Sequence, residues 1–266
     1  MTAAGFWNRK VKRRIVNIAA LVVLTGLVSM VSALDPTIRY TFDPNATPPD
    51  DLSTAKGIHN RGSAKGHDGT VINGTKHAQF VAGPSGNMNA IHLDGVNGPD
   101  NSTGSGIVTD VTTGDADVNI VAGPFTAMAW VNRDNLAGDN MVFGTGFGGP
   151  ADNPDPGGNG SLYLGFRDTV VWQGFFTRDN YATGILPGEW HHVAWRFDGA
   201  RTTDIFLDGE LASTDPLAQF YGNDFTLLVG RTTYNNGAYA GTLADVRIYN
   251  DLLPDSDIAA IAASPP

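Results

Sequence analysis

Short apolar or alternating runs fill the chain from Thr37 onward, and clusters of Gly, Asn, Asp and Pro separate them. In the run Trp190–Phe197, Val193, Trp195 and Phe197 share one face of an extended strand, and polar or small residues alternate with them. Many such runs without intervening helices are typical of half-buried strands. The pattern therefore predicts an all-β protein, a two-sheet antiparallel sandwich or jelly roll.

The individual strands follow from the positions of these runs. We expect them at Thr37–Phe42, Ala90–Leu93, Phe125–Val131, Met141–Phe143, Leu162–Phe166, Val170–Phe176, Trp190–Phe197, Asp204–Leu207, Phe225–Val229 and Leu243–Tyr249. Asp208-Gly209 predicts a tight hairpin, because glycine tolerates a positive φ. One short helix is expected at Asp257–Ala263, after Pro254.

The composition supports a β-protein rich in turns and excludes several kinds of chemistry. The chain has 33 Gly and 25 Asp but only two Glu, and Asp favours turns whereas Glu favours helices. It has no Cys, which excludes disulfides, thiolate metal sites and a cysteine nucleophile. The net charge of −10 argues against a nucleic-acid-binding surface, so we expect no nucleic-acid partner.

The N-terminus differs from the rest of the chain. A basic cluster opens it, formed by Arg9, Lys10, Lys12, Arg13 and Arg14. The apolar segment Ile15–Leu34 that follows would be roughly 30 Å long as a helix, enough to cross a bilayer. Val31-Ser32-Ala33 also fits a signal-peptidase site with cleavage after Ala33. Residues 1–33 are therefore expected to be a signal peptide or a single-span membrane anchor.

Both alternatives predict that the rest of the chain, residues 34–266, is one exported domain. The basic flank places the N-terminus in the cytoplasm and the domain on the opposite side of the membrane. The domain would be secreted or periplasmic after cleavage, or anchored to the outer side of the membrane without it. Outside the cell, free calcium is commonly high enough to fill weak binding sites.

Several segments of the exported part carry a family resemblance. Glu189–Ala194 (EWHHVA) with Ile205–Gly209 (IFLDG) resembles a signature of the LamG-like jelly-roll domains of the concanavalin A-like lectin/glucanase superfamily. Further similar segments follow the family's order: His67–Thr70, Ala90–Gly95, Phe125–Val131 and Gly241–Tyr249. Together they cover roughly residues 37–263. The resemblance implies a two-sheet antiparallel sandwich, often with a calcium ion at one rim, that binds glycans or proteins outside the cell.

The resemblance leaves catalysis open, because the superfamily includes glycoside hydrolases. Such enzymes place two carboxylates across the scissile bond, and the family's glucanases carry them on alternate positions of one strand. Here Glu189 precedes the family's Trp and Glu210 lies in a hairpin, and we find no strand with two Asp on one face. We therefore expect a binding domain and not an enzyme.

Calcium is the ion that this composition favours, because Asp, Asn and backbone carbonyls supply the oxygens it prefers. Asp94, Asn97 and Asp100 flank one loop, and the fold tends to bring Asp43 and Asp245 together near the chain ends. Each of these residues could instead only form a turn. Where the family more often has two successive acidic residues, this chain has Ala244-Asp245, which weakens a metal site there.

Glycan binding would need an aromatic ring beside polar groups. Trp172 and Tyr181 are candidates, and Tyr234, Asn235 and Asn236 form a turn with one ring and two amides. Most aromatic side chains of such a sandwich pack in its core, so packing is the competing role for each.

These observations leave two main functions open, and a third, a subunit of a surface filament, that the sequence does not separate from them. The first is a non-catalytic extracytoplasmic domain that recognises a glycan or an extracellular protein, with calcium as a cofactor. The alternative is an accessory subunit of a membrane-protein complex, in which residues 15–34 pack against transmembrane partners and the sandwich covers the outer face.

Overall fold

The computed structural model describes residues 35–98, 103–112, 115, 117–118, 120, 123–147, 162–174, 179–217, 225–232 and 237–266. The expected signal or anchor, residues 1–33, lies outside the described residues. Among the helices that are described, none has the length and apolar character needed to span a membrane.

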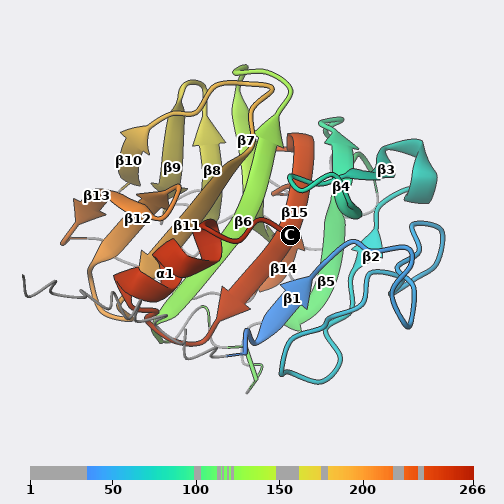
Figure 1. The fold of residues 1–266 in the computed structure, drawn as a ribbon, viewed down its shortest axis with the longest axis horizontal. Helices are drawn as coiled ribbons and strands as arrows, with labels where there is room; N and C mark the ends of the chain where they lie inside the picture. Colours follow the sequence, from blue (N-terminus) through green and yellow to red (C-terminus); the bar gives the residue numbers. More distant parts are fainter. Residues whose placement is uncertain are drawn as a thin grey trace, which may run out of the picture. The chain divides into compact units, whose positions relative to one another are not determined.

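The described strands form two antiparallel sheets, as the alternating pattern predicts (Figure 1). The eight-stranded sheet contains β13 (Glu210–Asp215), β12 (Thr203–Leu207), β11 (His191–Phe197), β6 (Phe125–Arg133), β15 (Ala240–Tyr249), β4 (Met88–Asp94) and β3 (Ala78–Ala82) in that order, and β1 (Ile38–Tyr40) pairs with β15. The seven-stranded sheet contains β10 (Asp179–Thr183), β9 (Val170–Gly174), β8 (Tyr163–Arg167), β7 (Asp139–Phe147), β14 (Phe225–Val229), β5 (Ile107–Thr112) and β2 (Thr70–Val71). The protein is thus an all-β sandwich.

The hydrophobic core lies between the two sheets. Val193, Trp195 and Phe197 of β11 are buried in it, which confirms the expected alternation. The indole of Trp195 packs edge-on against Phe143 of β7, with ring centroids 6.1 Å apart. Its N–H donates to the backbone carbonyl of Trp172 at 3.1 Å, so one side chain links the two sheets.

A single α-helix of the described chain, α1 (Asp255–Ala262), covers part of the outer face of the eight-stranded sheet (Figure 1). Its buried Ile258 packs with Leu253 against Met128 and Phe206 of the sheet. The helix begins two residues before the expected start, and Pro254 precedes it. The 3-10 turn η1 (Gly74–Lys76) is the other helical element of the described residues.

The ten expected strands are all present, and the described residues form five further strands that were not in the expected set. These are β2, β3, β5, β10 and β13, which are short or carry polar residues. The hairpin between β12 and β13 is confirmed, because Leu207 pairs with Glu210 and both turn residues, Asp208 and Gly209, have positive φ values of 51° and 86°.

Candidate functional site

The outer face of the seven-stranded sheet carries a stack of an arginine and two aromatic side chains. Leu164 and Phe166 of β8 point into the core, so Tyr163 and Arg167 point outward. The rings of Tyr163 and Trp172 are nearly parallel, at 9°, with centroids 5.2 Å apart. The guanidinium carbon of Arg167 lies 3.5 Å from the centroid of the Trp172 ring. This distance is typical of a close cation–π contact.

The stack depends on glycine at two neighbouring positions. Trp172 pairs in register with Gly165, which lies between Tyr163 and Arg167 on β8 and has no side chain to compete with the indole. A Cβ on Gly174 would lie 2.8 Å from the indole carbons Cε2 and Cζ2 of Trp172. The Trp172 indole therefore lies over β9, in space that a side chain at Gly174 would occupy.

Arg167 is also the centre of a charged cluster. Its Nε donates to Asp139 at 3.1 Å, and its Nη1 lies 3.7 Å from the Asp179 carboxylate. Burial alone would lower the pKa of Arg167, but the hydrogen bond to Asp139 and the negative charges of Asp139 and Asp179 together outweigh burial and raise the pKa above the ordinary value. The guanidinium is thus charged and fixed in orientation at all ordinary pH values.

Tyr181 adds an accessible ring to this cluster. It is the register partner of Trp172 on the edge strand β10 and lies on the same face of the sheet. Its hydroxyl donates to Asp179 at 2.7 Å and is 3.4 Å from Arg167 Nη1. Burial, then the hydrogen bond to Asp179, raises the pKa of Tyr181 above its ordinary value, so the phenol keeps its proton. The tyrosine is 43% exposed.

The structure thus brings together two of the residues that the sequence suggested as ligand-binding. Trp172 is only 4% exposed and stacks against Arg167 and Tyr163, whereas Tyr181 is accessible to the solvent. Tyr234, Asn235 and Asn236 lie outside the described residues. Tyr163 and Arg167 were not among the residues proposed from the sequence, although the alternation through Leu162–Arg167 would have placed them on one face.

Two of the residues expected to bind calcium bond to protein groups near the end of β4. His77 Nδ1 lies 2.8 Å from Asp94 Oδ2, and the backbone N–H of Val96 donates to Asp94 Oδ1 at 3.1 Å. The side-chain oxygen of Asn97 accepts from the backbone N–H of Ala238 at 3.0 Å. Both carboxylate oxygens of Asp94 thus have a partner, and its side chain is 39% exposed.

A buried arginine bonds to the two described ends of the loop after Asp94. The Arg231 guanidinium donates to the backbone carbonyls of Gly98 at 3.2 Å and of Thr103. Asp100, the third residue expected to bind calcium here, lies outside the described residues. Within the described residues no group of three or more His, Asp or Glu side chains is arranged to hold a metal ion.

Asp43 and Asp245, the other two candidates, are in separate bonding networks. Asp43 accepts from the backbone N–H of Asn45 at 2.8 Å, in a turn. Asp245 is 3% exposed and pairs with Arg39, at 2.8 Å, and with Arg247. Burial raises the pKa of Asp245, but its hydrogen bonds and charge pairs with the two arginines lower it below the ordinary value. Both carboxylate oxygens of Asp245 are therefore already paired with arginine guanidinium groups.

A family model described as the concanavalin A-like lectin/glucanases superfamily matches residues 103–259, more than half of the chain. The chain belongs to this superfamily. The match confirms the resemblance drawn from the sequence, and it covers most of the strands of this concanavalin A-like domain, including all those that carry the aromatic cluster. None of the curated proteins matches the chain in sequence.

Solved structures confirm the jelly-roll fold. Domain 4 of AbnA, an extracellular arabinanase from Geobacillus stearothermophilus solved in complex with arabinotriose, is 19% identical with a TM-score of 0.60, covering 86% of this chain and 98% of that domain. The botulinum neurotoxin serotype G binding domain is 10% identical, with a TM-score of 0.56. The binding domain of Paraclostridial Mosquitocidal Protein 1 is 14% identical, with a TM-score of 0.54. The matches cover 86% of this concanavalin A-like chain but about half of each toxin domain (51% and 52%).

Proposed function

We propose that this concanavalin A-like domain is a non-catalytic, extracytoplasmic glycan-binding domain, and that the outer face of its seven-stranded sheet contacts the sugar. The observation that carries the proposal is the exposure of the Tyr181 ring beside the charged cluster. Among the described residues it is the only aromatic side chain in the set of exposed large hydrophobic residues, and it adjoins a fixed guanidinium and two carboxylates. A ring face for stacking, with charged hydrogen-bonding groups beside it, is the combination that a sugar requires.

The immobility of the cluster favours tight recognition. Arg167 is stacked on Trp172 and paired with Asp139, so it loses little conformational freedom when a ligand binds. Support also comes from domain 4 of AbnA, which was solved with arabinotriose and shares the fold. Its ligand makes arabino-oligosaccharides the first glycans to test.

A non-catalytic role agrees with the carboxylates of this face. Glycoside hydrolysis needs one carboxyl group that donates a proton and a second that acts as nucleophile or base. Asp139 and Asp179 both lie within ion-pair distance of the same guanidinium, that of Arg167, and Asp179 also accepts from Tyr181. Both carboxylates therefore serve to orient the cluster in this proposal.

The decisive experiment measures glycan binding with one ring removed. The full-length chain in non-ionic detergent is titrated calorimetrically with arabinotriose and then with a panel of neutral oligosaccharides. For a glycan that binds, Tyr181→Ala should lower the affinity about tenfold or more, because it removes a stacking ring. Leu252→Ala, which removes an exposed apolar side chain after β15, should leave the affinity unchanged. Equal affinity of Tyr181→Ala and the unaltered chain would contradict the proposal.

Calcium assistance is a separate part of the proposal. We place the ion at the loop that begins at Asp94, where one partly exposed carboxylate is described. Calcium should then raise the melting temperature of the full-length chain, chelation with EGTA should reverse the increase, and Asp94→Asn should abolish it. An identical melting temperature with calcium and with EGTA would exclude calcium as a stabilising ligand without affecting the proposal for Tyr181.

A further inference from the structure

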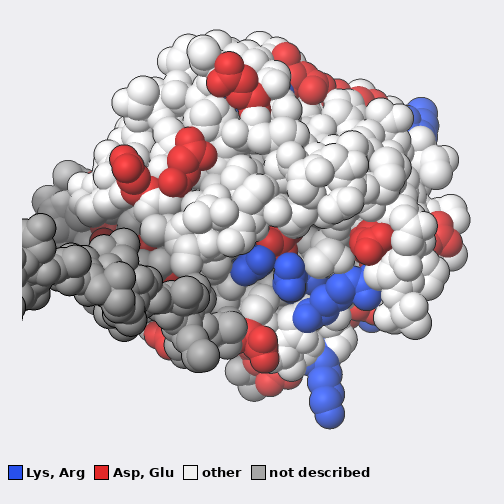
Figure 2. Space-filling model, viewed as in Figure 1, with Lys and Arg blue, Asp and Glu red and all other residues white. Residues whose placement is uncertain are grey.

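Basic side chains gather on the opposite face of the sandwich, over β1 and β15 (Figure 2). Arg39 of β1 and Arg247 of β15 are register partners, and Arg61 lies beside them because its backbone N–H donates to the Arg39 carbonyl at 2.8 Å. Lys65 follows four residues later on the same segment.

Five of the 17 basic residues precede residue 34, so the domain has twelve basic against 27 acidic residues. A third of its positive charges lie in this one strip of Arg39, Arg61, Lys65 and Arg247.

The carboxylates that pair with this strip lie beneath it. The side chain of Asp50 is 0% exposed and that of Asp245 is 2% exposed, whereas Arg39 is 36% and Arg61 is 21% exposed. The buried carboxylates hold the arginines in place, and the side chains of Arg39 and Arg61 remain partly exposed to the solvent, more so than that of Arg247 at 16%. The surface of the strip is therefore positive on a domain that is acidic overall.

Several donors of the strip remain free. Arg39 uses only its Nε, toward Asp245, so both of its terminal nitrogens lack partners among the described residues. Arg61 bonds through Nε to Thr41 and through Nη2 to Asp50, which leaves Nη1 unused in that same part of the chain. Lys65 has no hydrogen bond or ion pair there either and is exposed. Planar guanidinium groups with free N–H pairs match carboxylate and sulfate oxygens.

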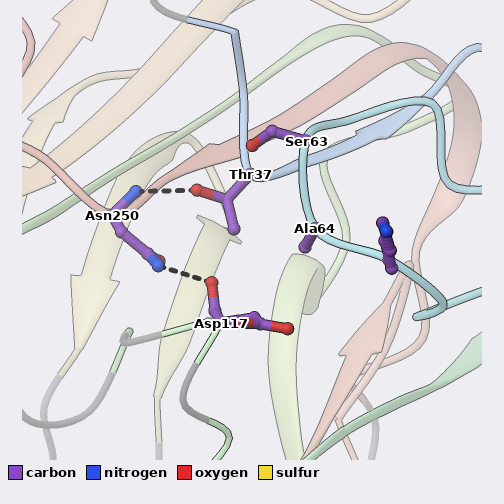
Figure 3. A pocket seen from close by; sticks show the side chains of 6 residues that line it. Thr37, Ser63, Ala64, Asp117 and Asn250 are labelled. Carbon is purple, nitrogen blue, oxygen red and sulfur yellow. Dashed lines mark hydrogen bonds between the residues drawn. The ribbon is translucent and has the colours of Figure 1, made fainter.

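A polar hollow adjoins the end of the strip, and Figure 3 shows side chains that line this hollow. Its volume is about 490 Å³, and it is lined by Thr37, Ser63, Ala64, Lys65, Asp117 and Asn250. The backbone N–H of Asn250 donates to Thr37 Oγ1 at 3.2 Å, and its side-chain amide donates to the Asp117 carbonyl at 2.6 Å. Thr37 directly precedes β1, and the backbone N–H of Ala64 donates to its carbonyl at 3.1 Å. Lys65 belongs to both the strip and the lining of the hollow, so hollow and strip are continuous.

We propose that the strip and the hollow form a second ligand site that binds an acidic glycan, one carrying carboxylate or sulfate groups. The free donors of Arg39, Arg61 and Lys65 bind the anionic groups, and the hydroxyl and amide groups of the hollow accommodate a sugar ring. This site lies on the eight-stranded sheet and the Tyr181 cluster on the other, so the inference goes beyond the proposed function and does not depend on it.

The test compares variants that reverse or remove a positive charge of the strip with a variant of equal net charge outside it. The full-length chain in non-ionic detergent is titrated with polygalacturonate, with dextran sulfate and with neutral dextran. We expect binding of one or both acidic polymers, weakened by salt, and none of dextran. Lys65→Glu and Arg39→Gln should each weaken binding about tenfold or more. Lys76→Glu is the matched control, because Lys76 is also exposed and the change in net charge equals that of Lys65→Glu.

Each outcome decides the proposal. The polymer that binds more tightly identifies carboxylate or sulfate as the recognised group. Equal weakening by Lys65→Glu and Lys76→Glu would overturn the site, because binding would then follow net charge alone. Tighter binding of poly-glutamate or of phosphatidylserine vesicles than of both polysaccharides would also overturn it, in favour of an acidic protein or a membrane surface. Tyr181→Ala should not change binding of the acidic polymers, which separates this site from the proposed one.

Discussion

At the scale of single residues, His192 is a polar group that lies on the outer face of the eight-stranded sheet and is nevertheless buried. His192 is 1% exposed and packs edge-on against Trp130, with ring centroids 5.5 Å apart. Burial, then the charge of Arg247, lowers the pKa of His192 from 6.5 to about 4. The imidazole is therefore neutral in the folded protein at pH values where the unfolded chain is protonated.

This difference predicts a pH-dependent stability. Below pH 6.5 the unfolded state binds a proton at His192 that the folded state does not, so stability falls as the pH falls toward about 4. The loss would amount to about 3 kcal/mol over this window. In His192→Gln, the free energy of unfolding measured by urea titration at a series of pH values should fall less steeply between pH 6.5 and 4. Parallel curves for the variant and the unaltered chain would show that His192 contributes nothing.

At the scale of elements, the register of β8, β9 and β10 creates the candidate site. Pairing aligns Trp172 with Gly165 on one side and with Tyr181 on the other. The strands themselves follow from their alternating sequences, but alternation does not specify which strands are neighbours or how far each is shifted. The edge strand β10, with the sequence DNYAT, has little apolar character, and pairing with β9 explains why it is extended.

Gly174 offers a test of this arrangement. Gly174→Ala would place a methyl group about 2.8 Å from the Trp172 indole, so the ring must move, and the stack with Tyr163 and Arg167 is disturbed. We expect a loss of stability of about 1–3 kcal/mol in urea unfolding, as for other overpacked sites. In a Trp172→Ala background the same substitution should cost much less, because the clash is gone. An equal cost in both backgrounds would show that the indole is not what excludes a side chain.

At the scale of the whole molecule, export is the prediction on which the biological context depends. It rests on the basic cluster and apolar run of residues 1–34, and it assigns the sandwich to the non-cytoplasmic side. We expect intact-mass measurement of the native protein to find either a soluble exported form that lacks residues 1–33 or the full-length chain in the membrane fraction. The first result would favour a free binder and the second an anchored domain. The full-length mass in the soluble cytoplasmic fraction would contradict export.

The sequence by itself determined the class of fold and the family. Period-two alternation, Gly- and Asp-rich turns and the segments around Glu189–Gly209 depend on local physics, because each strand exposes its faces according to its own sequence. Trp172 and Tyr181 could be proposed from the sequence as candidates, but nothing in it showed that they meet.

Only the tertiary structure decided which distant groups act together. Arg39 and Asp245 are 206 residues apart and form an ion pair, and Arg61 reaches Asp50 under the same strip. Such contacts depend on strand order, register and the depth at which each side chain lies, and none of these is encoded in a local pattern. For the same reason Asp245 could be proposed as a metal ligand from its sequence position, whereas the fold places it between two arginines.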